Sequence, residues 1–129
     1  MTQRLDEGLL VLRIGIGAMF VSHGLPKLSG GPVLWEQIGH AMDVFGVHFA
    51  PTFWGLAAAV SESVGGVCLA FGLLFRPATA LLFATMVVAS ARHLEHGDGF
   101  VKASHAIEAA ILFAGLYLMG PGAYRFGKR

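Results

Sequence analysis

Four long apolar stretches constrain the fold of this chain more than any other feature of its sequence. They cover roughly residues 8–25, 53–75, 77–93 and 104–119. Each is close to the roughly 17–25 residues that an α-helix needs to cross the hydrocarbon of a bilayer. Within that hydrocarbon only helices and closed barrels satisfy their backbone polar groups. The sequence therefore predicts an all-α membrane protein, a bundle of four transmembrane helices that forms one domain over residues 1–129.

The composition agrees with a membrane protein and excludes other classes. Of the 129 residues, 55% are hydrophobic and 13% are charged, whereas about a quarter are charged in an ordinary soluble domain. The net charge is +1 and there is no run of Lys and Arg, so we expect no nucleic-acid partner. Cys68 is the single cysteine. An internal disulfide, a Cys-x-x-Cys redox pair and a thiolate metal cage therefore cannot form within the chain, and redox chemistry would need a bound cofactor.

The basic residues of the loops predict the orientation in the membrane. With four spans both termini lie on one side, and the basic residues on that side are Arg4, Arg76, Arg125, Lys128 and Arg129. Those of the other side are Lys27, Arg92 and Lys102. By the positive-inside rule both termini are cytoplasmic, in a multi-pass protein of the cytoplasmic (inner) membrane. No convincing small-residue cleavage site follows the first apolar stretch, so we expect it to be retained as a helix.

Two connections are informative. Only Arg76 and Pro77 separate the second and third stretches, which predicts a tight hairpin, since proline forbids the earlier helix from continuing and suits the first turn of the next. In the first loop, apolar residues recur at helical spacing over residues 32–45, before Gly46. This pattern predicts an amphipathic helix in the membrane interface. The predicted helix is either a lid over the mouth of the bundle or an interfacial anchor. As an anchor it would place Trp35 and Trp54 in the aromatic belt.

Glu62 lies in the middle of the second apolar stretch. A carboxylate at that depth costs several kcal/mol unless it is paired or neutral, so it predicts a functional site with a partner. The alternative is a neutral, hydrogen-bonded packing carboxyl. Small residues surround it at helical spacing, namely Ala58, Ala59, Gly65 and Gly66, and they favour close approach of another helix.

Several residues of the other helices are candidate partners. Side chains lean toward the N-terminus of their own helix, so Arg13 leans away from Glu62. It either bridges to Glu62 or reaches the inner interface with its stem on the apolar wall. Residues near the outer helix ends lean toward Glu62 instead. The predicted outer cluster is His23, Lys27, Glu62, Arg92, His93, His105 and Glu108. The alternative for each histidine or lysine alone is contact with lipid headgroups.

Such a cluster suits proton exchange, because burial raises carboxyl pKa values and histidine titrates near neutrality. An apolar pocket with these groups at one end would bind a quinone, whose carbonyls need proton donors and whose tail needs lipid.

Metal binding is the rival hypothesis, since His93 and His96 are three residues apart and His23, His40, His48 and His105 would share their side. The spacing is common by chance, so we assign neither a metal nor a haem.

The same residues resemble a known family. The segment Leu12-Arg13-Ile14-Gly15-Ile16-Gly17, followed by Phe20, His23, Gly24 and Lys27, is similar to the first helix of DoxX membrane proteins. Glu62 before Gly65-Gly66, then Gly72-Leu73-Leu74-Phe75-Arg76, and finally Glu108 before Gly120-Pro121-Gly122 continue the likeness over nearly the whole chain.

The resemblance implies a small four-helix membrane subunit. In one branch of the family it is the membrane part of a thiosulfate:quinone oxidoreductase, and in others a partner of soluble redox or detoxifying enzymes. It supports Arg13, His23, Lys27 and Glu62 as site residues. We expect a membrane component of a quinone-linked oxidoreductase, in which Glu62 with His23 or His93 relays protons. Arg92 with Lys27 would attract an anionic substrate or a quinone carbonyl.

Two other functions remain open from the sequence. One is a non-enzymatic membrane anchor or maturation partner of a soluble redox protein, docked through the interfacial helix. The other is a small transporter or metal-handling protein built as a homo-oligomer, because glycine-rich helix faces can pack between subunits as well as within one.

Overall fold

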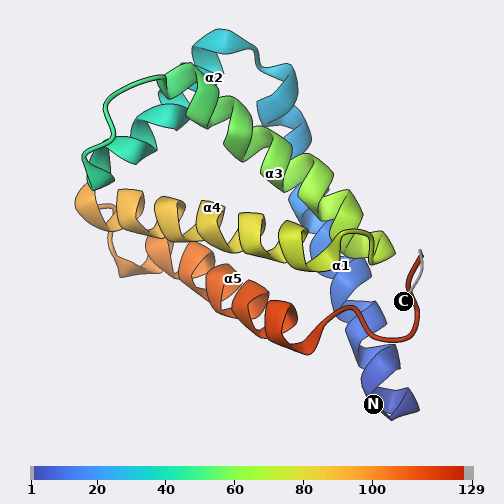
Figure 1. The fold of residues 1–129 in the computed structure, drawn as a ribbon. Coiled ribbons are helices and arrows are strands. Elements are labelled where there is room, and N and C mark those ends of the chain that lie inside the picture. Colours follow the sequence, from blue (N-terminus) through green and yellow to red (C-terminus); the bar gives the residue numbers. More distant parts are fainter. Residues whose placement is uncertain (1, 127–129) are drawn as a thin grey trace.

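The computed structural model describes residues 2–126, and over these residues it is helical with no β-strand. The elements are α1 (Gln3–Ser29), α2 (Pro32–Gly39), the 3₁₀ helix η1 (His40–Phe45), α3 (Pro51–Phe71), α4 (Phe75–Glu95) and α5 (Phe100–Met119). Four of them, α1, α3, α4 and α5, are long and apolar enough to cross a membrane. The predicted all-α membrane fold is confirmed. The start of α1 and the end of α5 lie at one end of the bundle, and α2 lies at the other (Figure 1).

Helices α1 and α3 cross with their backbones in contact. A Cβ atom on Gly17 would lie 2.6 Å from the carbonyl oxygen of Gly66, and one on Gly66 would lie 2.8 Å from that of Gly17. Farther along α1, a Cβ on Gly24 would collide with the backbone of Ser63. Glycine at these positions therefore permits the close approach, which is a common way for transmembrane helices to associate where water exclusion gives no driving force.

Helices α4 and α5 form the second pair, and side chains of α1 and α3 complete the core. Leu82 of α4, Phe113 and Leu116 of α5 and Leu69 of α3 have no exposed surface. Phe20 of α1 meets the ring of Phe113 edge to face, with centroids 4.9 Å apart. Most of the remaining large apolar side chains point outward, as expected for helices that face lipid rather than water.

The turn between α3 and α4 lies earlier than predicted. The sequence interpretation extended the second helix to Phe75 and began the third at Pro77, whereas α3 ends at Phe71 and α4 begins at Phe75. Gly72 follows α3 with φ +71°, the left-handed conformation that commonly ends a helix and favours glycine. Pro77 then fits within the first turn of α4, because backbone N–H groups there have no partner within the helix. Glycine, not proline, sets this helix end.

The other predicted boundaries differ by a few residues. Helix α1 continues from 25 to Ser29 although Pro26 lies within it, and it begins at Gln3, where the hydroxyl of Thr2 accepts a bond from Leu5 N. Helix α5 begins at Phe100 rather than 104. Proline near the end of a helix removes one hydrogen bond without preventing a last turn. The extension of α1 matters because it places Lys27 within the helix.

The predicted interfacial helix exists but is divided. Residues 32–39 form α2, residues 40–45 form η1, and Gly46 with φ +75° ends the segment. Helix α2 packs on the first turns of α3, where a Cβ on Gly55 would collide with the carbonyl of Trp35. A Cβ on Gly39 would likewise collide with the carbonyl of Pro51. The α2–η1 segment is therefore fixed against the bundle at the end opposite to the termini (Figure 1).

Candidate functional site

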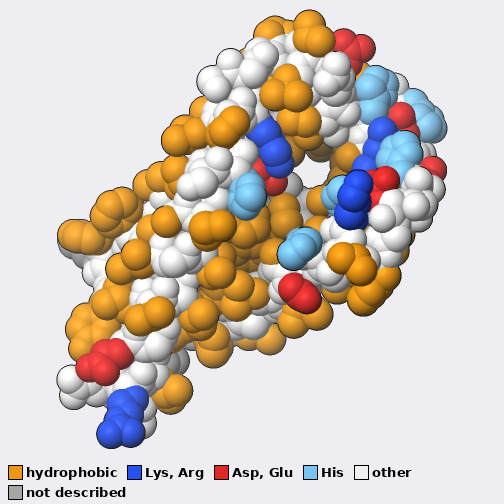
Figure 2. Space-filling view, turned by 180° about the vertical axis from the view of Figure 1, so that it is seen from behind, with side chains coloured by type: hydrophobic (Ala, Val, Ile, Leu, Met, Phe, Trp, Pro, Cys, Tyr) orange, Lys and Arg blue, Asp and Glu red, His pale blue; other side chains and the backbone are white. Residues whose placement is uncertain are grey.

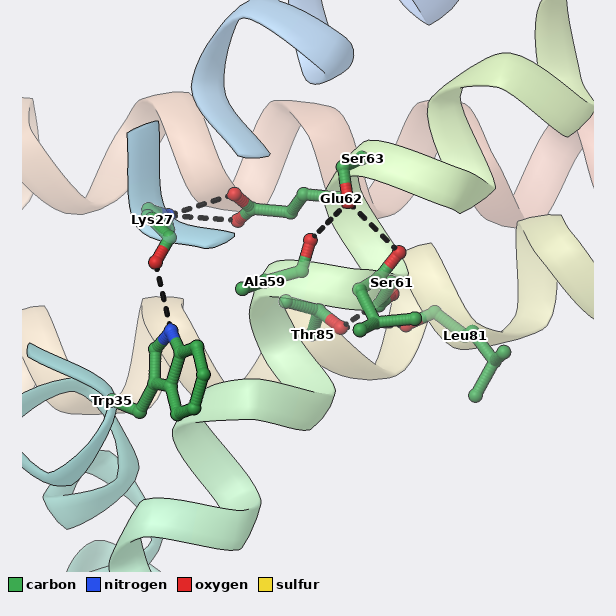
Figure 3. A network of polar contacts seen from close by, with 9 residues as sticks. Lys27, Trp35, Ala59, Ser61, Glu62, Ser63, Leu81 and Thr85 are labelled. Atoms are coloured by element: carbon green, nitrogen blue, oxygen red, sulfur yellow. Dashed lines mark hydrogen bonds and ion pairs between the residues drawn. The ribbon is translucent and has the colours of Figure 1, made fainter. Parts of the chain in front are cut away.

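Glu62 lies in the middle of α3, and only 4% of its side chain is exposed. The ammonium of Lys27 lies 2.8 Å from one of its carboxylate oxygens and 3.0 Å from the other. Lys27 itself is 36% exposed. Figure 3 shows the lysine reaching both oxygens from the end of α1. The predicted partner of Glu62 is thus the lysine of the outer cluster rather than one of its histidines.

The ion pair depends on the close crossing of α1 and α3. Gly24 and Lys27 are three residues apart, so they lie on one face of α1. Gly24 rests against the α3 backbone at Ser63, directly after Glu62. This contact places the last turn of α1 above Glu62, and the long lysine side chain then spans the remaining distance. Gly24 therefore determines where the ammonium of Lys27 lies relative to Glu62.

A cavity of about 270 Å³ lies beside this ion pair, between α3, α4 and the α2–η1 segment. Its polar lining residues are Lys27, Glu62, Ser61 and Thr85, and its apolar ones include Ile38, Met42, Trp54, Ala58, Leu81 and Val88. A few polar groups in a mostly apolar hollow are typical of sites that bind small molecules. We refer to this hollow as the ion-pair cavity.

Two hydroxyl groups join α3 and α4 in the wall of the ion-pair cavity. Thr85 Oγ1 lies 3.0 Å from Ser61 Oγ and 2.8 Å from the carbonyl oxygen of Leu81 (Figure 3). Each hydroxyl has one proton to donate and can accept further bonds. A ligand in the cavity would therefore find hydrogen-bonding capacity on this wall as well as at Lys27.

The α2–η1 segment covers the cavity and is held at two points. The indole Nε1 of Trp35 donates to the carbonyl oxygen of Lys27 at 2.9 Å, which joins α2 to the end of α1. Arg92 of α4 donates through Nη1 to the carbonyl oxygen of His40 at 3.1 Å, which joins η1 to α4. Arg92 therefore does not face Glu62 but holds the cover of the cavity. The α2–η1 segment is therefore packed against the bundle over the ion-pair cavity.

Asp43 ties η1 to the loop that follows it. Its two carboxylate oxygens lie 3.1 Å from His40 Nδ1 and 3.1 Å from His48 Nδ1. Desolvation acts to raise the pKa of Asp43, but the hydrogen bonds to His48 and His40 outweigh it and hold this pKa below the usual value. The cover of the cavity therefore includes a solvent-exposed polar cluster whose charge depends on pH.

Arg13 is fully buried and lies away from Glu62. Its guanidinium donates to the carbonyl oxygens of Leu69 at 3.3 Å, Ala70 at 3.1 Å and Pro121 at 2.8 Å, and also to that of Tyr124. It leans toward the end of the bundle that holds the termini, as its position on α1 predicts. It neither bridges to Glu62 nor reaches water, and it does not line the ion-pair cavity. Its hydrogen bonds go to backbone carbonyls of α3 and of the segment after α5.

The remaining residues of the predicted outer cluster do not line the ion-pair cavity. His23 is exposed and meets the ring of Phe20 edge to face at 6.0 Å. His93 Nδ1 lies 2.9 Å from an oxygen of Asp98, and this hydrogen bond lowers the pKa of Asp98. His105 and Glu108 are exposed on α5. Charged and histidine side chains nevertheless gather around one hollow of the surface, as Figure 2 shows, whereas the flanks are mostly apolar.

Sequence reasoning missed Ser61, Thr85 and the apolar wall of the cavity. Serine and threonine in apolar helices usually bond to a carbonyl of the preceding turn, as Ser63 does to Ala59 at 2.7 Å. No local pattern distinguishes Ser61 from Ser63, so only the packing of α4 identifies the one that faces the cavity.

Among residues 2–126, no group of three or more His, Cys, Asp or Glu side chains is placed to hold a metal ion.

Comparison with known proteins places the chain among similar sequences. The family model described as DoxX matches residues 8–93. A protein of Bacillus subtilis (strain 168) named "Putative oxidoreductase CatD" is 32% identical over 87 residues, which cover 67% of this chain and 60% of that protein. The alignment thus spans less than two thirds of the relative. No solved structure matches the chain.

Proposed function

The chain belongs to the DoxX family of membrane proteins, and from this premise we propose that it is the membrane component of a quinone-linked oxidoreductase. In this proposal the ion-pair cavity binds the quinone headgroup beside Lys27 and Glu62. The observation that supports it is the buried carboxylate of α3, paired with a lysine at the edge of a mostly apolar cavity within the bundle. The name of the similar Bacillus subtilis protein agrees with an oxidoreductase.

The residues of the cavity fit a quinone headgroup. A quinone ring is apolar on its faces and bears two carbonyl oxygens that accept hydrogen bonds. The ammonium of Lys27 is a charged donor, and the hydroxyl of Ser61, which accepts a bond from Thr85 Oγ1, is a neutral donor in the same lining. Apolar residues such as Met42 and Trp54 surround the remaining space. A bond from a charged donor to one carbonyl would orient the ring, because such bonds are stronger than neutral ones.

Lys27 would supply both protons in turn, with Glu62 as its counter-ion. Reduction of a quinone to a quinol takes up two electrons and two protons, so a proton source beside the carbonyl is required. Lys27 is partly exposed while Glu62 is buried, so Lys27 would donate to the ring carbonyl and regain its proton from water. Glu62 would hold the ammonium in place and stabilise its charge in the low-dielectric interior. The electrons come from a separate donor, a partner subunit or a small molecule.

Titration of the purified protein in lipid nanodiscs with a short-chain quinone analogue tests this proposal. Trp54 lines the cavity, so quinone binding should quench tryptophan fluorescence saturably. Loss of a hydrogen bond to a charged group costs about 1.5–3 kcal/mol, so Lys27→Gln should weaken binding by about tenfold or more. Glu62→Gln should also weaken it, and Ala58→Phe should block the cavity.

Glu95→Gln is the matched control for Glu62→Gln. Glu95 is the exposed last residue of α4 and does not line the cavity, so its variant should bind the analogue as the wild type does. Unsaturable quenching by wild type, or equal binding by the Lys27→Gln and Ala58→Phe variants, would remove quinone binding in this cavity.

A second candidate function is a membrane partner that anchors or matures a soluble redox enzyme. It is favoured by apolar side chains that stay exposed around the cover, with Val33 71%, Phe49 67% and Phe53 59% exposed. These side chains would contact either the partner or the membrane interface. Quinone-linked activity that is unchanged in membranes containing the Glu62→Gln variant would favour this candidate over the first.

The proposal also includes cytoplasmic termini in the inner membrane. Arg4, Arg76 and Arg125 belong to the end of the bundle where α1 begins and α5 ends, and the positive-inside rule places such an end in the cytoplasm. A fluorescent protein fused to the C-terminus should then fold and fluoresce, whereas a periplasmic phosphatase fused there should be inactive. The reverse pattern would invert the orientation.

A further inference from the structure

A second cavity lies at the opposite end of the molecule from the cover, where α3 turns into α4. Its volume is about 480 Å³. The residues that line it come from the turn, the first residues of α4 and the segment after α5, and they are Gly72, Leu73, Leu74, Phe75, Arg76, Pro121, Arg125 and Phe126. None of the described residues of this lining is acidic. The family resemblance and the proposed function assign no role to this hollow, which we call the arginine cavity.

Positive charge concentrates at the arginine cavity. Arg76 and Arg125 line it, and Arg13 lies directly behind its wall, because a Cβ on Gly72 would lie 2.9 Å from Arg13 Nη2 and 2.7 Å from Arg125 Cβ. Within residues 2–126, none of these three arginines forms an ion pair with a carboxylate. The nearby Asp6 instead accepts a bond from Ala123 N at 3.0 Å.

Within residues 2–126 no ion pair compensates this charge, which is buried at Arg13, half-buried at Arg125 and exposed at Arg76. Arg13 is 1% exposed, and burial of a charge is unfavourable unless opposite charge or strong hydrogen bonds offset it. Carbonyl oxygens supply the hydrogen bonds of Arg13 but no full negative charge. The guanidinium carbon of Arg76 lies 5.9 Å from the ring centre of Tyr117, which leaves its donors free for an anion. The cavity therefore favours a negatively charged occupant.

The rim of the arginine cavity is apolar and exposed. Leu74 is 74% exposed, Phe126 65% and Leu73 39%. These residues lie at the end of two transmembrane helices, where the hydrocarbon meets the headgroups. A free phosphate would gain nothing from such a rim, whereas acyl chains would bury it. The combination of arginines within and apolar side chains around fits a molecule with an anionic head and an apolar tail.

We propose that the arginine cavity binds the phosphate headgroup of an anionic phospholipid, with its acyl chains along Leu73, Leu74 and Phe126. Arginine suits this role because its planar guanidinium forms paired hydrogen bonds with phosphate oxygens. Basic pockets between transmembrane helices are a recurrent way to hold anionic lipid headgroups. The site is independent of the ion-pair cavity, since the two cavities share no lining residue.

Native mass spectrometry of the full chain released from detergent tests the proposal. The protein is equilibrated with phosphatidylglycerol and with phosphatidylcholine of the same acyl chains. One site with two arginines should retain phosphatidylglycerol about thirtyfold better, at about 1 kcal/mol for each basic residue near an anionic headgroup. The Arg76→Gln, Arg125→Gln double variant should lose this preference to within about twofold.

Arg4→Gln is the matched control, because Arg4 is an exposed arginine at the same end of the bundle that does not line the cavity. It should keep the preference. Should the double variant fail to fold, the two single variants provide the same test. Equal retention of the two lipids by wild type, an undiminished preference in the variants, or displacement of the lipid by millimolar inorganic phosphate would overturn the proposal.

Discussion

Arg13 and Glu62 are both buried charges on the faces where α1 and α3 cross, yet the structure satisfies them in different ways. Arg13 binds four backbone carbonyls from α3 and the C-terminal segment, and it forms no ion pair with any of residues 2–126. Glu62 is bound by the single side chain of Lys27 and lies at the edge of a cavity. The first charge joins α1 to α3 and to the segment after α5, whereas the second lines the ion-pair cavity beneath the cover.

The difference explains why the two residues are expected to have different roles. The donors of Arg13 are occupied by groups that cannot titrate or leave, so it acts as a fixed joint between α1, α3 and the segment after α5. The carboxylate of Glu62 has a partner that is 36% exposed and therefore reaches solvent. The partners of a buried charge, and not its burial alone, therefore distinguish a fixed structural contact from a candidate site.

Replacement of Arg13 should have the largest effect. Arg13→Met removes the guanidinium donor from the carbonyls of Ala70, Pro121 and Tyr124, whereas Leu69 O keeps its bond from Gly72 N. Each unsatisfied group costs about 1–3 kcal/mol. We expect the free energy of unfolding in mixed micelles to fall by about 3–5 kcal/mol, since part of the segment would relax. Arg4→Met, at an exposed position of the same helix, should change it by less than about 0.5 kcal/mol. A loss below about 1 kcal/mol for Arg13→Met would mean that these carbonyls are satisfied in another way.

The helix crossing that positions both charges can be tested with two glycines of α1. Gly17→Ala places a Cβ 2.6 Å from Gly66 O and should destabilise the protein by about 1–3 kcal/mol, because overpacking separates α1 from α3. Gly15→Ala meets nothing within 4 Å and should be neutral or stabilising by up to about 1 kcal/mol. The two variants, compared by detergent unfolding, should therefore differ in sign. Equal effects would contradict a backbone-to-backbone crossing.

The Lys27–Glu62 pair should respond asymmetrically. Lys27→Gln leaves a buried carboxylate without its partner and should destabilise the protein by about 1–2 kcal/mol. Glu62→Gln leaves a lysine that is already 36% exposed and can extend to water, so its cost should stay below about 1 kcal/mol. A double-mutant cycle in the same unfolding assay measures the coupling. If Glu62→Gln destabilises the protein more than Lys27→Gln does, then Lys27 depends more on Glu62 than Glu62 depends on Lys27. That result would contradict the predicted order.

The smallest effect concerns the cover of the ion-pair cavity. The pKa of Asp43 lies below its ordinary value of 3.8, because its hydrogen bonds to two histidines outweigh desolvation. A depressed carboxyl pKa contributes stability that is present above the ordinary value and is lost as the pH falls through the lower, folded value. Amide hydrogen exchange of residues 40–48 should therefore accelerate, after correction for the intrinsic rate, as the pH falls below about 3.8.

Asp43→Asn should remove this pH dependence while leaving exchange in α3 unchanged. Asp98→Asn is its counterpart outside the cover, since Asp98 pairs with His93 in the α4–α5 loop. That variant should leave the exchange of residues 40–48 as in wild type. An identical acid response in the Asp43→Asn variant would show that other groups hold the cover.

Part of the fold follows from local patterns of the sequence, and the errors also have local causes. The four apolar stretches, the amphipathic segment at residues 32–45 and the stop at Gly46 depend only on spacing and on glycine conformation, so they were predictable. The predicted position of the α3–α4 turn is wrong because the prediction relied on Pro77 rather than on Gly72. A proline in the first turn of a helix does not mark where the preceding helix ends. The extension of α1 past Pro26 was missed for the same reason.

The candidate site was predicted less completely. Glu62 was identified because a carboxylate in an apolar helix is anomalous by itself, and Lys27 was placed in its cluster. The expected contributions of His93 and Arg92 to one pocket assumed that similar depth brings side chains together. In the structure Arg92 binds η1 and His93 binds Asp98, because depth fixes only one coordinate and the angles between helices fix the others.

The sequence by itself determined that this protein crosses a membrane with four helices and that Glu62 needs a partner, since both follow from transfer free energies that each segment has alone. Only the tertiary structure decided that Lys27 is that partner, that Arg13 binds backbone carbonyls instead, and that a separate cavity lies beside each of the two residues. The physical reason is that the partner of a buried charge depends on how closely two helices approach. That approach is set at Gly17, Gly24 and Gly66 by contacts between backbones distant in the chain.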